Sequence, residues 1–558
     1  MKRRDFVRAI ALATGTLYIK GYDEALAALA QPPRIPSKLL REFNPVDRGF
    51  EDVAPRQFFG DELTRAHAML RDGTTPPVAP PSEQANVVVI GGGIAGLFST
   101  YLLRRHKPIL LEQASRFGGN SKAQSWLGND FALGAAYYCY AEEDDPTQLL
   151  YNELGLDKLY KVKEEEDPVL HSGRVYRDFW EGVTAPGQEA QFKTLAAYFK
   201  SVYNEENDQR YPEIPFDADE DAEMAAYVRG LDRKSLRQLA EEVAGGALHP
   251  HIETALQHYC WSSLGASLDE VSAAGGLNFY AAEFGPLYVT PGGNAGAAEQ
   301  ILRKIGESVS PTNLRAGSMV YCVERRSDGV HVSYVGADGP KTIKAKAVVM
   351  ACPKFIVKKI LRDIEPERVE AIERLNYRSY LVANVLLRGK PKEEFYDLYM
   401  LQDGRVDSSD LKRSATEHGF QDTINAAYAH PDPADPEHAV LTLYRGIPYD
   451  GAREEIEPDD SYESWRAAFA KQVEAQVLPV LGFDSRNIVD LRVARWGHAL
   501  PISAVGLIAD GVVQKLRAPF KERVFFVEQD NWALPAFETC LGEAMNWQAS
   551  IEAAIKLG

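Results

Sequence analysis

A glycine-rich loop between a short strand and a helix is the feature that most constrains this chain. Residues 86–90 form the β-branched run typical of a buried parallel strand, and residues 91–97 read Gly-Gly-Gly-Ile-Ala-Gly-Leu. Gly91, Gly93 and Gly96 fit the pattern G-x-G-x-x-G. In this pattern the first glycine permits a tight turn, the second lets the backbone approach a pyrophosphate, and the third lets helix and strand pack closely. The loop therefore predicts a Rossmann-like α/β unit.

The segment after the loop supplies the other parts of a dinucleotide site. Residues 97–105 are amphipathic, and a second apolar strand, 108–111, ends at Glu112. A carboxylate here accepts hydrogen bonds from a ribose diol, while the pyrophosphate meets the positive end of the helix. We therefore expect a dinucleotide to bind at the glycine-rich loop, at the start of the helix and at Glu112. The expected binding residues are Gly91, Gly93, Ile94, Ala95, Gly96, Glu112 and Gln113.

Composition excludes several other classes of protein. The 558 residues are 45% hydrophobic and carry a net charge of −18, from 62 basic and 80 acidic side chains. That balance is typical of a folded soluble protein and argues against a nucleic-acid partner, because phosphate binding needs a basic face. The five cysteines show no CxxC spacing and the histidines no HExxH, so we expect no metal site. No segment is long and apolar enough for an integral membrane span.

The first 85 residues precede the dinucleotide strand. Lys2-Arg3-Arg4, an apolar run at 9–19 and the small residues 28–30 predict a twin-arginine-type export signal over residues 1–30, and hence a periplasmic protein. The alternative is a basic amphipathic helix on a cytoplasmic protein. Residues 31–85 read as an N-terminal extension and Pro-rich linker, with a helix expected near 61–70.

Motifs along the rest of the chain resemble those of the flavin amine oxidase superfamily. Arg116, Gly118, Gly119 and Asn120 lie in a segment that resembles its R-x-G-G motif, which in that family wraps the FAD pyrophosphate. The segment 131–138, with Gly134 and Ala135, resembles the loop beneath the flavin ring. The resemblance implies FAD and not NAD as the cofactor.

Two later segments complete the resemblance. Residues 289–294 are similar to the P-x-G-G segment, and a valine that matches Val320 contacts the adenine in the family. Residues 523–530 resemble the closing motif, whose acid faces the ribityl phosphate. Asp530 matches that acid best and Glu528 is the alternative, because the usual glycine is missing.

Within the superfamily the chain is most similar to the spermidine dehydrogenase-like branch. The markers are residues 66–73, 117–119, 384–388 and 536–539. The implied fold is α/β, with a Rossmann-like FAD-binding domain interleaved with a discontinuous α+β substrate-binding domain. The expected FAD domain comprises 86–144, 286–374 and 496–558, and the expected substrate domain comprises 145–285 and 375–495.

The chain also departs from the family pattern. Many amine oxidases place a lysine near the flavin N5, where this chain has Asn384. The serine-glycine-cysteine segment that carries a covalent flavin in some relatives is absent, so we expect non-covalent FAD. Side chains expected to flank the flavin as catalytic candidates are Tyr137, Tyr138, Trp496, His498 and Trp532. Packing or a structural role is the alternative for each of them.

The resemblance implies an FAD-dependent oxidoreductase. The first hypothesis is hydride transfer from a C–N bond of a small amine or polyamine to the flavin N5, giving an imine that hydrolyses. Alternatives are a desaturase or oxidase of an apolar substrate, similar to the carotenoid and protoporphyrinogen branches, and a non-catalytic flavin-binding or maturation factor. The electron acceptor, O2 or another, and the oligomeric state stay open.

Two acidic runs suggest a path for a cationic substrate. They are residues 164–167 and the cluster from Asp217 to Glu223. Like charges gathered in this way steer cations toward a site. The alternative is that both runs are solvated faces of the protein.

Overall fold

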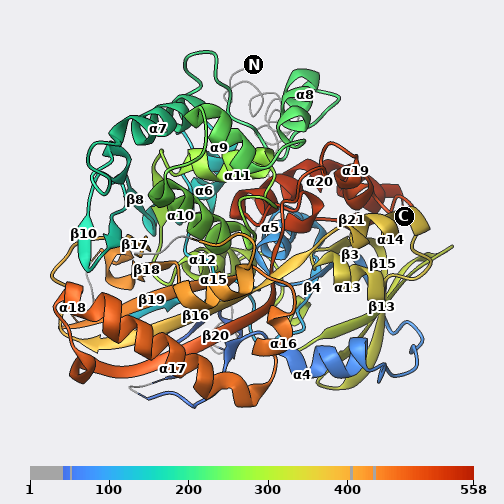
Figure 1. Cartoon of the computed structure of the whole chain (residues 1–558). Helices are drawn as coiled ribbons and strands as arrows, with labels where there is room; N and C mark the ends of the chain where they lie inside the picture. Colours follow the sequence, from blue (N-terminus) through green and yellow to red (C-terminus); the bar gives the residue numbers. More distant parts are fainter. Residues whose placement is uncertain (1–41, 51–52, 403–405, 432–434, 436, 558) are drawn as a thin grey trace.

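The computed structural model describes residues 42–50, 53–402, 406–431, 435 and 437–557, which form two sheet-centred lobes (Figure 1). The expected export signal, residues 1–30, lies outside these residues. One lobe is built on a seven-stranded sheet and the other on an eight-stranded sheet. Two three-stranded sheets, β1-β5-β6 and β7-β11-β8, lie between and beside them. The α/β fold expected from the sequence is confirmed.

The seven-stranded sheet holds the predicted Rossmann-like unit. Its order is β12-β4-β3-β15-β14-β13, and β21 pairs with β15. Its strands are β3 (Glu83–Ile90), β4 (Ile109–Leu111), β12 (Leu314–Arg315), β13 (Met319–Arg326), β14 (Gly329–Gly336), β15 (Gly339–Met350) and β21 (Val524–Phe526). Because β4, β3, β15 and β21 are parallel, their carboxyl ends meet at one edge of the sheet.

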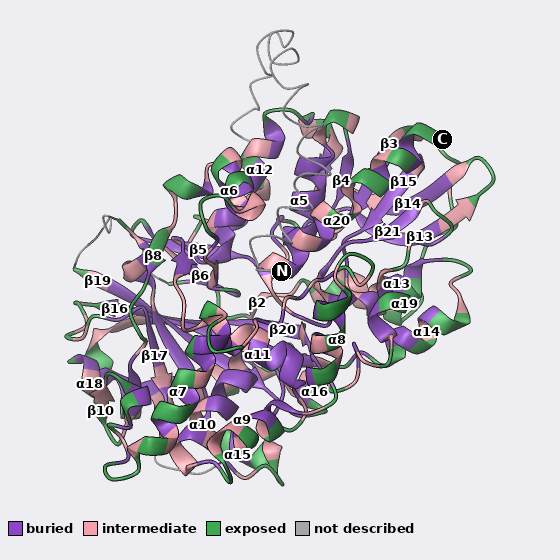
Figure 2. Cartoon of the chain, turned by 90° about the horizontal axis from the view of Figure 1, so that it is seen from above, coloured by how far each residue is buried: buried purple, intermediate pink, exposed green. Residues whose placement is uncertain are grey.

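Alternate residues of β3 face two different helical layers. Val87 and Val89 pack with α5 (Ile94–Leu102), α12 (Asn294–Gly306) and α20 (Phe537–Leu557). Val88 and Ile90 pack on the other side with α13 (Lys354–Ile360). Burial on both faces explains why this strand is apolar throughout its second half, and Figure 2 shows β3, β15 and β21 buried inside the lobe.

The eight-stranded sheet has the order β10-β9-β17-β18-β19-β16-β20-β2. Its strands are β2 (Phe59–Gly60), β9 (Val169–His171), β10 (Arg174–Tyr176), β16 (Tyr377–Arg388), β17 (Asp397–Met400), β18 (Asp422–Asn425), β19 (His438–Ile447) and β20 (Ile488–Pro501). One face, with Leu381 and Ala383, packs on the helices α15–α18. The other face, with Tyr380 and Val382, turns toward residues 126–136 of the dinucleotide lobe.

The remaining elements surround these sheets. The helices are α4 (Leu63–Ala66), α6 (Pro146–Leu154), α7 (Glu189–Asn204), α8 (Ala222–Leu231), α9 (Leu236–Ala244), α10 (Pro250–Tyr259), α11 (Ala273–Ala282), α14 (Pro366–Glu373), α15 (Leu411–His418), α16 (Ala452–Ile456), α17 (Tyr462–Gln472), α18 (Leu478–Leu481) and α19 (Val512–Arg517). The short strands are β1 (Val46–Asp47), β5 (Ala123–Trp126), β6 (Asn129–Ala132), β7 (Tyr137–Cys139), β8 (Lys161–Lys163) and β11 (Leu287–Val289). Helices α7–α11 share a large core with Ile502 and Trp532. None of the helices in the described ranges is long and apolar enough to cross a bilayer.

The expected domain boundary at 495/496 is wrong. Residues 488–501 form one continuous strand, β20, which pairs with β16 along most of its length. Trp496 and His498 therefore lie on the eight-stranded sheet and not on the FAD lobe. The extension 31–85 is also more than a linker, because its β2 pairs with β20 and its α4 is followed by a π-helical turn at His67–Arg71.

Substituting Gly96 tests the helix–strand packing of the predicted loop. A Cβ at Gly96 would lie 1.8 Å from the carbonyl oxygen of Gly91, so Gly96→Ala should lower the free energy of unfolding by about 3 kcal/mol. Gly230→Ala in α8 is the matched control, because nothing lies within 4 Å of the added methyl group and the protein should gain about 0.5–1 kcal/mol. Urea unfolding curves measure both values. Equal midpoints for the two variants would contradict the predicted packing.

Candidate functional site

A cavity of about 920 Å³ runs from the glycine-rich loop to the tyrosine-bearing face of the eight-stranded sheet. Its first end lies at the carboxyl edge of β3 and β4, as is usual for ligand sites in parallel sheets. The residues expected at a dinucleotide that line it are Gly91, Gly93, Ile94, Ala95, Glu112, Gln113, Gly118, Gly119, Asn120, Gly134, Ala135, Val320, Glu528 and Asp530. Segments separated by more than 400 residues thus meet in one space.

The three glycines of the loop have different tasks. Gly91 has φ +107°, and a Cβ there would lie 2.1 Å from the carbonyl oxygen of Ala351. Gly96 packs against Gly91 and does not line the cavity. At Gly93 an added Cβ would meet only Gly119, at 3.6 Å. The surrounding protein atoms would therefore permit a side chain at Gly93. Because glycine has none, space is left for a ligand over the start of α5, where no side chain caps the helix.

Glu112 is held in the position that the sequence predicts. Its side chain accepts hydrogen bonds from the backbone N–H groups of Gly92 at 2.6 Å and Ala114 at 2.7 Å. Burial raises the pKa of Glu112, and the two N–H donors oppose that shift. Each oxygen keeps a lone pair that can accept from a hydroxyl group.

Arg116 is the one residue of its loop whose expected role needs correction. Its guanidinium pairs with Asp47 at 2.9 Å and donates to the backbone oxygen of Asn44 at 3.1 Å. It is not among the residues that line the cavity. The N-terminal extension therefore holds this arginine, while the backbone of Gly118 and Gly119 faces the cavity.

Residues 132–136, which contain Gly134 and Ala135, are tied to the eight-stranded sheet through their carbonyl groups. The donors are Asn384 Nδ2 to Ala132 at 3.1 Å, Trp496 Nε1 to Leu133 at 2.7 Å, Tyr444 Oη to Gly134 at 2.6 Å and Tyr396 Oη to Ala136 at 3.2 Å. Asn384 is fully buried and also accepts from Thr442. At the position of the family lysine the chain thus has a structural amide that does not line the cavity.

Glu528 and Asp530 of the closing motif both line the cavity, and both are engaged by Lys354. The buried Lys354 amino group forms an ion pair with Glu528, and its backbone N–H donates to Asp530 at 2.8 Å. Tyr377 also donates to Asp530. Gln529, between the two acids, lines the cavity as well. Lys354 was not predicted, because a lone lysine after a strand carries no recognisable spacing.

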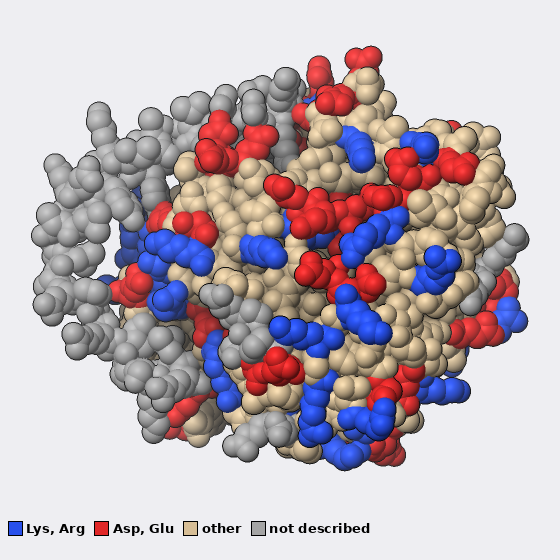
Figure 3. All heavy atoms as spheres, turned by 90° about the vertical axis from the view of Figure 1, so that its left-hand side faces the viewer, with Lys and Arg blue, Asp and Glu red and all other residues tan. Residues whose placement is uncertain are grey.

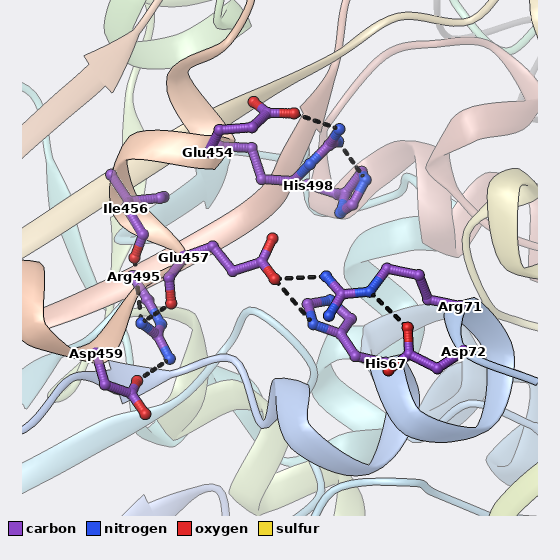
Figure 4. A network of polar contacts seen from close by, with 10 residues as sticks. His67, Arg71, Asp72, Glu454, Ile456, Glu457, Asp459, Arg495 and His498 are labelled. Atoms are coloured by element: carbon purple, nitrogen blue, oxygen red, sulfur yellow. Dashed lines mark hydrogen bonds and ion pairs between the residues drawn. The ribbon is translucent and has the colours of Figure 1, made fainter. Parts of the chain in front are cut away.

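His498 lies in a polar network at the rim of the cavity (Figure 4). Arg453 Nη1 lies 2.6 Å from His498 Nε2, and the imidazole stacks on Phe355 at a centroid distance of 4.1 Å. A guanidinium has no acceptor, so Nε2 accepts and the neutral ring carries its proton on Nδ1. Burial lowers the pKa of His498 to about 4, and Arg453 acts in the same direction. The ring is therefore a neutral hydrogen-bond donor, and its Nε2 is not free to act as a base.

The N-terminal extension forms part of the same rim. Asp61 accepts from the backbone N–H of Gly497 at 2.7 Å, and Glu457 pairs with both His67 and Arg71. All of these side chains except the glycine line the cavity. The extension thus covers the cofactor end of the cavity.

Of the aromatic candidates, Tyr137, Tyr138 and Trp496 line the cavity. Tyr138 is buried and stacks on Phe537, whereas Tyr137 reaches the far end of the cavity. Trp532 does not line the cavity, so its expected place at the substrate is corrected. Its indole packs against Phe216 and donates to the buried Glu543 at 2.9 Å.

Three carboxylates at the far end of the cavity were not predicted. Glu283 accepts hydrogen bonds from Tyr137 at 2.8 Å and Tyr259 at 2.9 Å, and Asp397 and Asp422 lie on neighbouring strands. Each is a single acid within an apolar segment. The pairing of β17 and β18 brings Asp397 and Asp422 together, and Glu283 joins them from the end of α11, so local spacing gives no signal for the three acids.

The two acidic runs do not lie along this cavity. Residues 164–167 line a separate cavity of about 240 Å³, and Asp221 caps the start of α8 by accepting from Met224. Acidic and basic side chains are interspersed on the face shown in Figure 3. The run from Asp217 to Glu223 is mostly exposed and matches the solvated-face alternative, whereas Asp167 of the first run is partly buried and pairs with Lys163.

Comparison with known proteins decides the family. The model of the flavin-containing amine oxidoreductases matches residues 94–524. The chain belongs to this family. It is 23% identical over 533 residues to oxidoreductase PigB of Serratia sp. (strain ATCC 39006), covering 86% of this chain and 76% of that protein. It is thus an FAD oxidoreductase of the flavin-containing amine oxidoreductase type.

Solved structures share the fold of this family member. A putrescine oxidase variant superimposes with a TM-score of 0.60 at 16% identity, covering 85% of this chain and 100% of that one. A fatty acid isomerase from P. acnes that produces CLA gives a TM-score of 0.59 at 15% identity, covering 84% and 98%. At these identities the likeness concerns the fold alone.

The residues of the cavity fit a flavin dinucleotide. The open space over Gly93, the uncapped start of α5 and the buried Glu112 suit a pyrophosphate and a ribose. The tethered loop 132–136 presents a fixed wall for a ring system. The five cysteines form no disulfide with one another, and the described parts of the chain hold no group of His, Cys, Asp and Glu that could bind a metal ion.

Substituting Gly93 separates ligand binding from folding. Gly93→Ala should fold normally, because the added Cβ meets protein atoms only at van der Waals distance. It should lose flavin affinity by about tenfold or more, because the methyl group enters the space of the pyrophosphate. Flavin content after purification and fluorescence titration of the apoprotein measure this loss, and the urea midpoint serves as the folding control. Wild-type affinity in Gly93→Ala would show that the dinucleotide does not cross this loop.

Proposed function

We propose that the protein uses non-covalent FAD to oxidise a C–N bond of a small amine. The observation that carries this proposal is the single cavity that joins a dinucleotide cradle to a chamber lined by tyrosines and carboxylates. Family membership supports an amine substrate. Acid precipitation should release the yellow flavin into the supernatant, whereas a covalent flavin would stay with the pellet.

The chamber is suited to bind an amine and to desolvate it. Tyr137, Trp496 and Leu500 give it aromatic and apolar walls, which hold the donor carbon and lower the pKa of the bound amine by desolvation. When bound, FAD supplies the acceptor for a hydride. The C–H bond breaks with its electron pair, the nitrogen lone pair forms the C=N bond, and the N–H proton leaves to water. Hydrolysis of the imine completes the reaction.

The neutral state of His498 suits this chemistry. Because burial and Arg453 hold the pKa of His498 at about 4, the ring adds no positive charge to a chamber that receives a cation. Its remaining role is to donate a hydrogen bond through Nδ1. Activity between pH 6 and 8 should therefore not follow the titration of His498.

An apolar substrate is the second candidate. Ile214, Phe279 and Ile424 also line the chamber, and Asn384 replaces the family lysine. These residues suit dehydrogenation of a C–C bond in a hydrophobic molecule. The buried carboxylates favour the amine, since an apolar ligand leaves them unpaired.

Anaerobic reduction of the flavin tests the proposed reaction. A panel of monoamines, diamines and polyamines is added to the holoprotein without O2, and the loss of flavin absorbance is followed. At least one amine should bleach the flavin in a saturable manner. Bleaching by apolar alkenes or cyclic hydrocarbons, with no response to any amine, would favour the second candidate and overturn the first.

We also propose export through the segment 1–30. The supporting observation is Arg3-Arg4 followed by an apolar run and small residues. In a bacterial host with the twin-arginine pathway, the wild-type protein should reach the periplasm with its flavin, and Arg3→Lys/Arg4→Lys should stay in the cytoplasm. Fractionation followed by flavin fluorescence measures both. Equal distribution of the two proteins would contradict the proposal.

A further inference from the structure

The pairing of four strands gathers polar side chains on the cavity face of the eight-stranded sheet. Asp422 lies opposite Tyr444, and Tyr444 lies opposite Val382. Asp397 is two residues before Tyr399, the partner of Asp422, so both acids project from the same face. Both line the cavity.

Each of these acids is buried with an unpartnered oxygen. Asp397 is 3% exposed and Asp422 is 5% exposed. Ser262 donates to Oδ2 of Asp422 at 2.6 Å, whereas no described residue donates to Oδ1 of Asp422 or to Oδ1 of Asp397. A buried carboxylate oxygen without a donor is costly, and such groups in native proteins usually mark a site for a ligand or ion.

The charges around the two acids are unbalanced. Glu283 lines the same end of the cavity, and the carboxylate of Asp167 accepts a hydrogen bond from the backbone N–H of Asp397 at 3.3 Å. The cation that acts on these carboxylates is Lys163, which is already paired with Asp167. The chamber therefore has an excess of carboxylates over amino groups, and a positively charged ligand would correct it.

We propose that Asp397 and Asp422 bind a second cationic group of the substrate, an ammonium remote from the carbon that is oxidised. The substrate class is then a diamine or polyamine. An ammonium has three N–H donors, and Oδ1 of Asp397 and Oδ1 of Asp422 are acceptors for two of them. Tyr380 and Tyr444 line the same cavity, and aromatic rings suit a cation as well. This inference rests on the proposed amine oxidation.

The subsite should bind its cation in a pH-dependent manner. The pKa of Asp422 is raised to about 7, chiefly by burial and also by the charges of Glu283 and Asp167, against the opposing hydrogen bond from Ser262. Burial and the charge of Asp422 also raise the pKa of Asp397. The other groups that interact with the pair are Lys163 and the hydroxyl groups of Tyr137, Tyr380, Tyr396, Tyr399 and Tyr444. Since the carboxylate form binds the cation, affinity for a dication should rise as pH increases through about 7, and binding should release protons.

The experiment compares 1,4-diaminobutane with n-butylamine on the oxidised holoprotein. Dissociation constants come from the perturbation of the flavin absorbance, which requires no turnover. The wild type should bind the diamine about tenfold or more tightly than the monoamine. Asp397→Asn and Asp422→Asn should each abolish this preference, and the flavin that they retain after purification shows that the variants are folded.

The matched control is Asp219→Asn, which removes one exposed carboxylate outside the cavity and should keep the preference. Equal affinity for the two amines in the wild type, or an unchanged preference in both asparagine variants, would overturn the subsite and leave the two acids as a carboxyl pair that shares a proton. Failure of amine oxidation is a separate result, because anaerobic bleaching reports it and the binding titration does not. Proton release on diamine binding, measured with a pH indicator, should disappear in Asp422→Asn.

Discussion

The hydrogen bonds to residues 132–136 fix the position of the two lobes relative to each other. Three side chains of the eight-stranded sheet and that of Tyr396, directly before β17, donate to four of the five carbonyl groups, and the backbone N–H of Asn294 donates to the fifth, that of Ala135, at 3.0 Å. A loop with every carbonyl engaged has little freedom to shift. The wall of the flavin chamber and the face that carries Asp397 and Asp422 are therefore one rigid unit. The distance from cofactor to substrate depends on this contact.

Buried acids in this protein fall into two kinds. Glu112 is satisfied by backbone N–H groups, and Glu528 and Asp530 are satisfied by Lys354 and its neighbours. These carboxylates order the protein around the cofactor. Asp397 and Asp422 have unpartnered oxygens in the same cavity. The difference between the two kinds is one of hydrogen bonding and not of burial, which is nearly equal for all of them.

The cofactor lobe was largely predictable because its signals are local. Gly91, Gly93, Gly96 and Glu112 lie within one strand–helix–strand unit, and their spacing alone predicts the turn, the packing and a ribose contact. The errors concern contacts made across the chain. Arg116 forms an ion pair with Asp47, and Trp532 packs in the hydrophobic core of helices α7–α11.

The chamber was less predictable because its residues meet only through contacts between distant parts of the chain. Asp397 and Asp422 become neighbours only through the register of β17 and β18, which no local pattern encodes. The boundary at 495/496 failed because β20 continues as an extended strand through Gly497. Most residues identified through sequence motifs therefore lie at the dinucleotide end of the cavity, and the acids found only in the structure lie at its far end; Lys354 beside Glu528 and Tyr137 beside Glu283 are the exceptions.

The contact between Asp61 and Gly497 joins residues that are 436 positions apart. During synthesis the extension emerges first, yet its partner strand β20 is made only near the end of translation. The cofactor end of the cavity consequently stays uncovered until almost the whole chain has left the ribosome. The order of synthesis thus makes the closing of this end of the cavity and the completion of the fold a single late event.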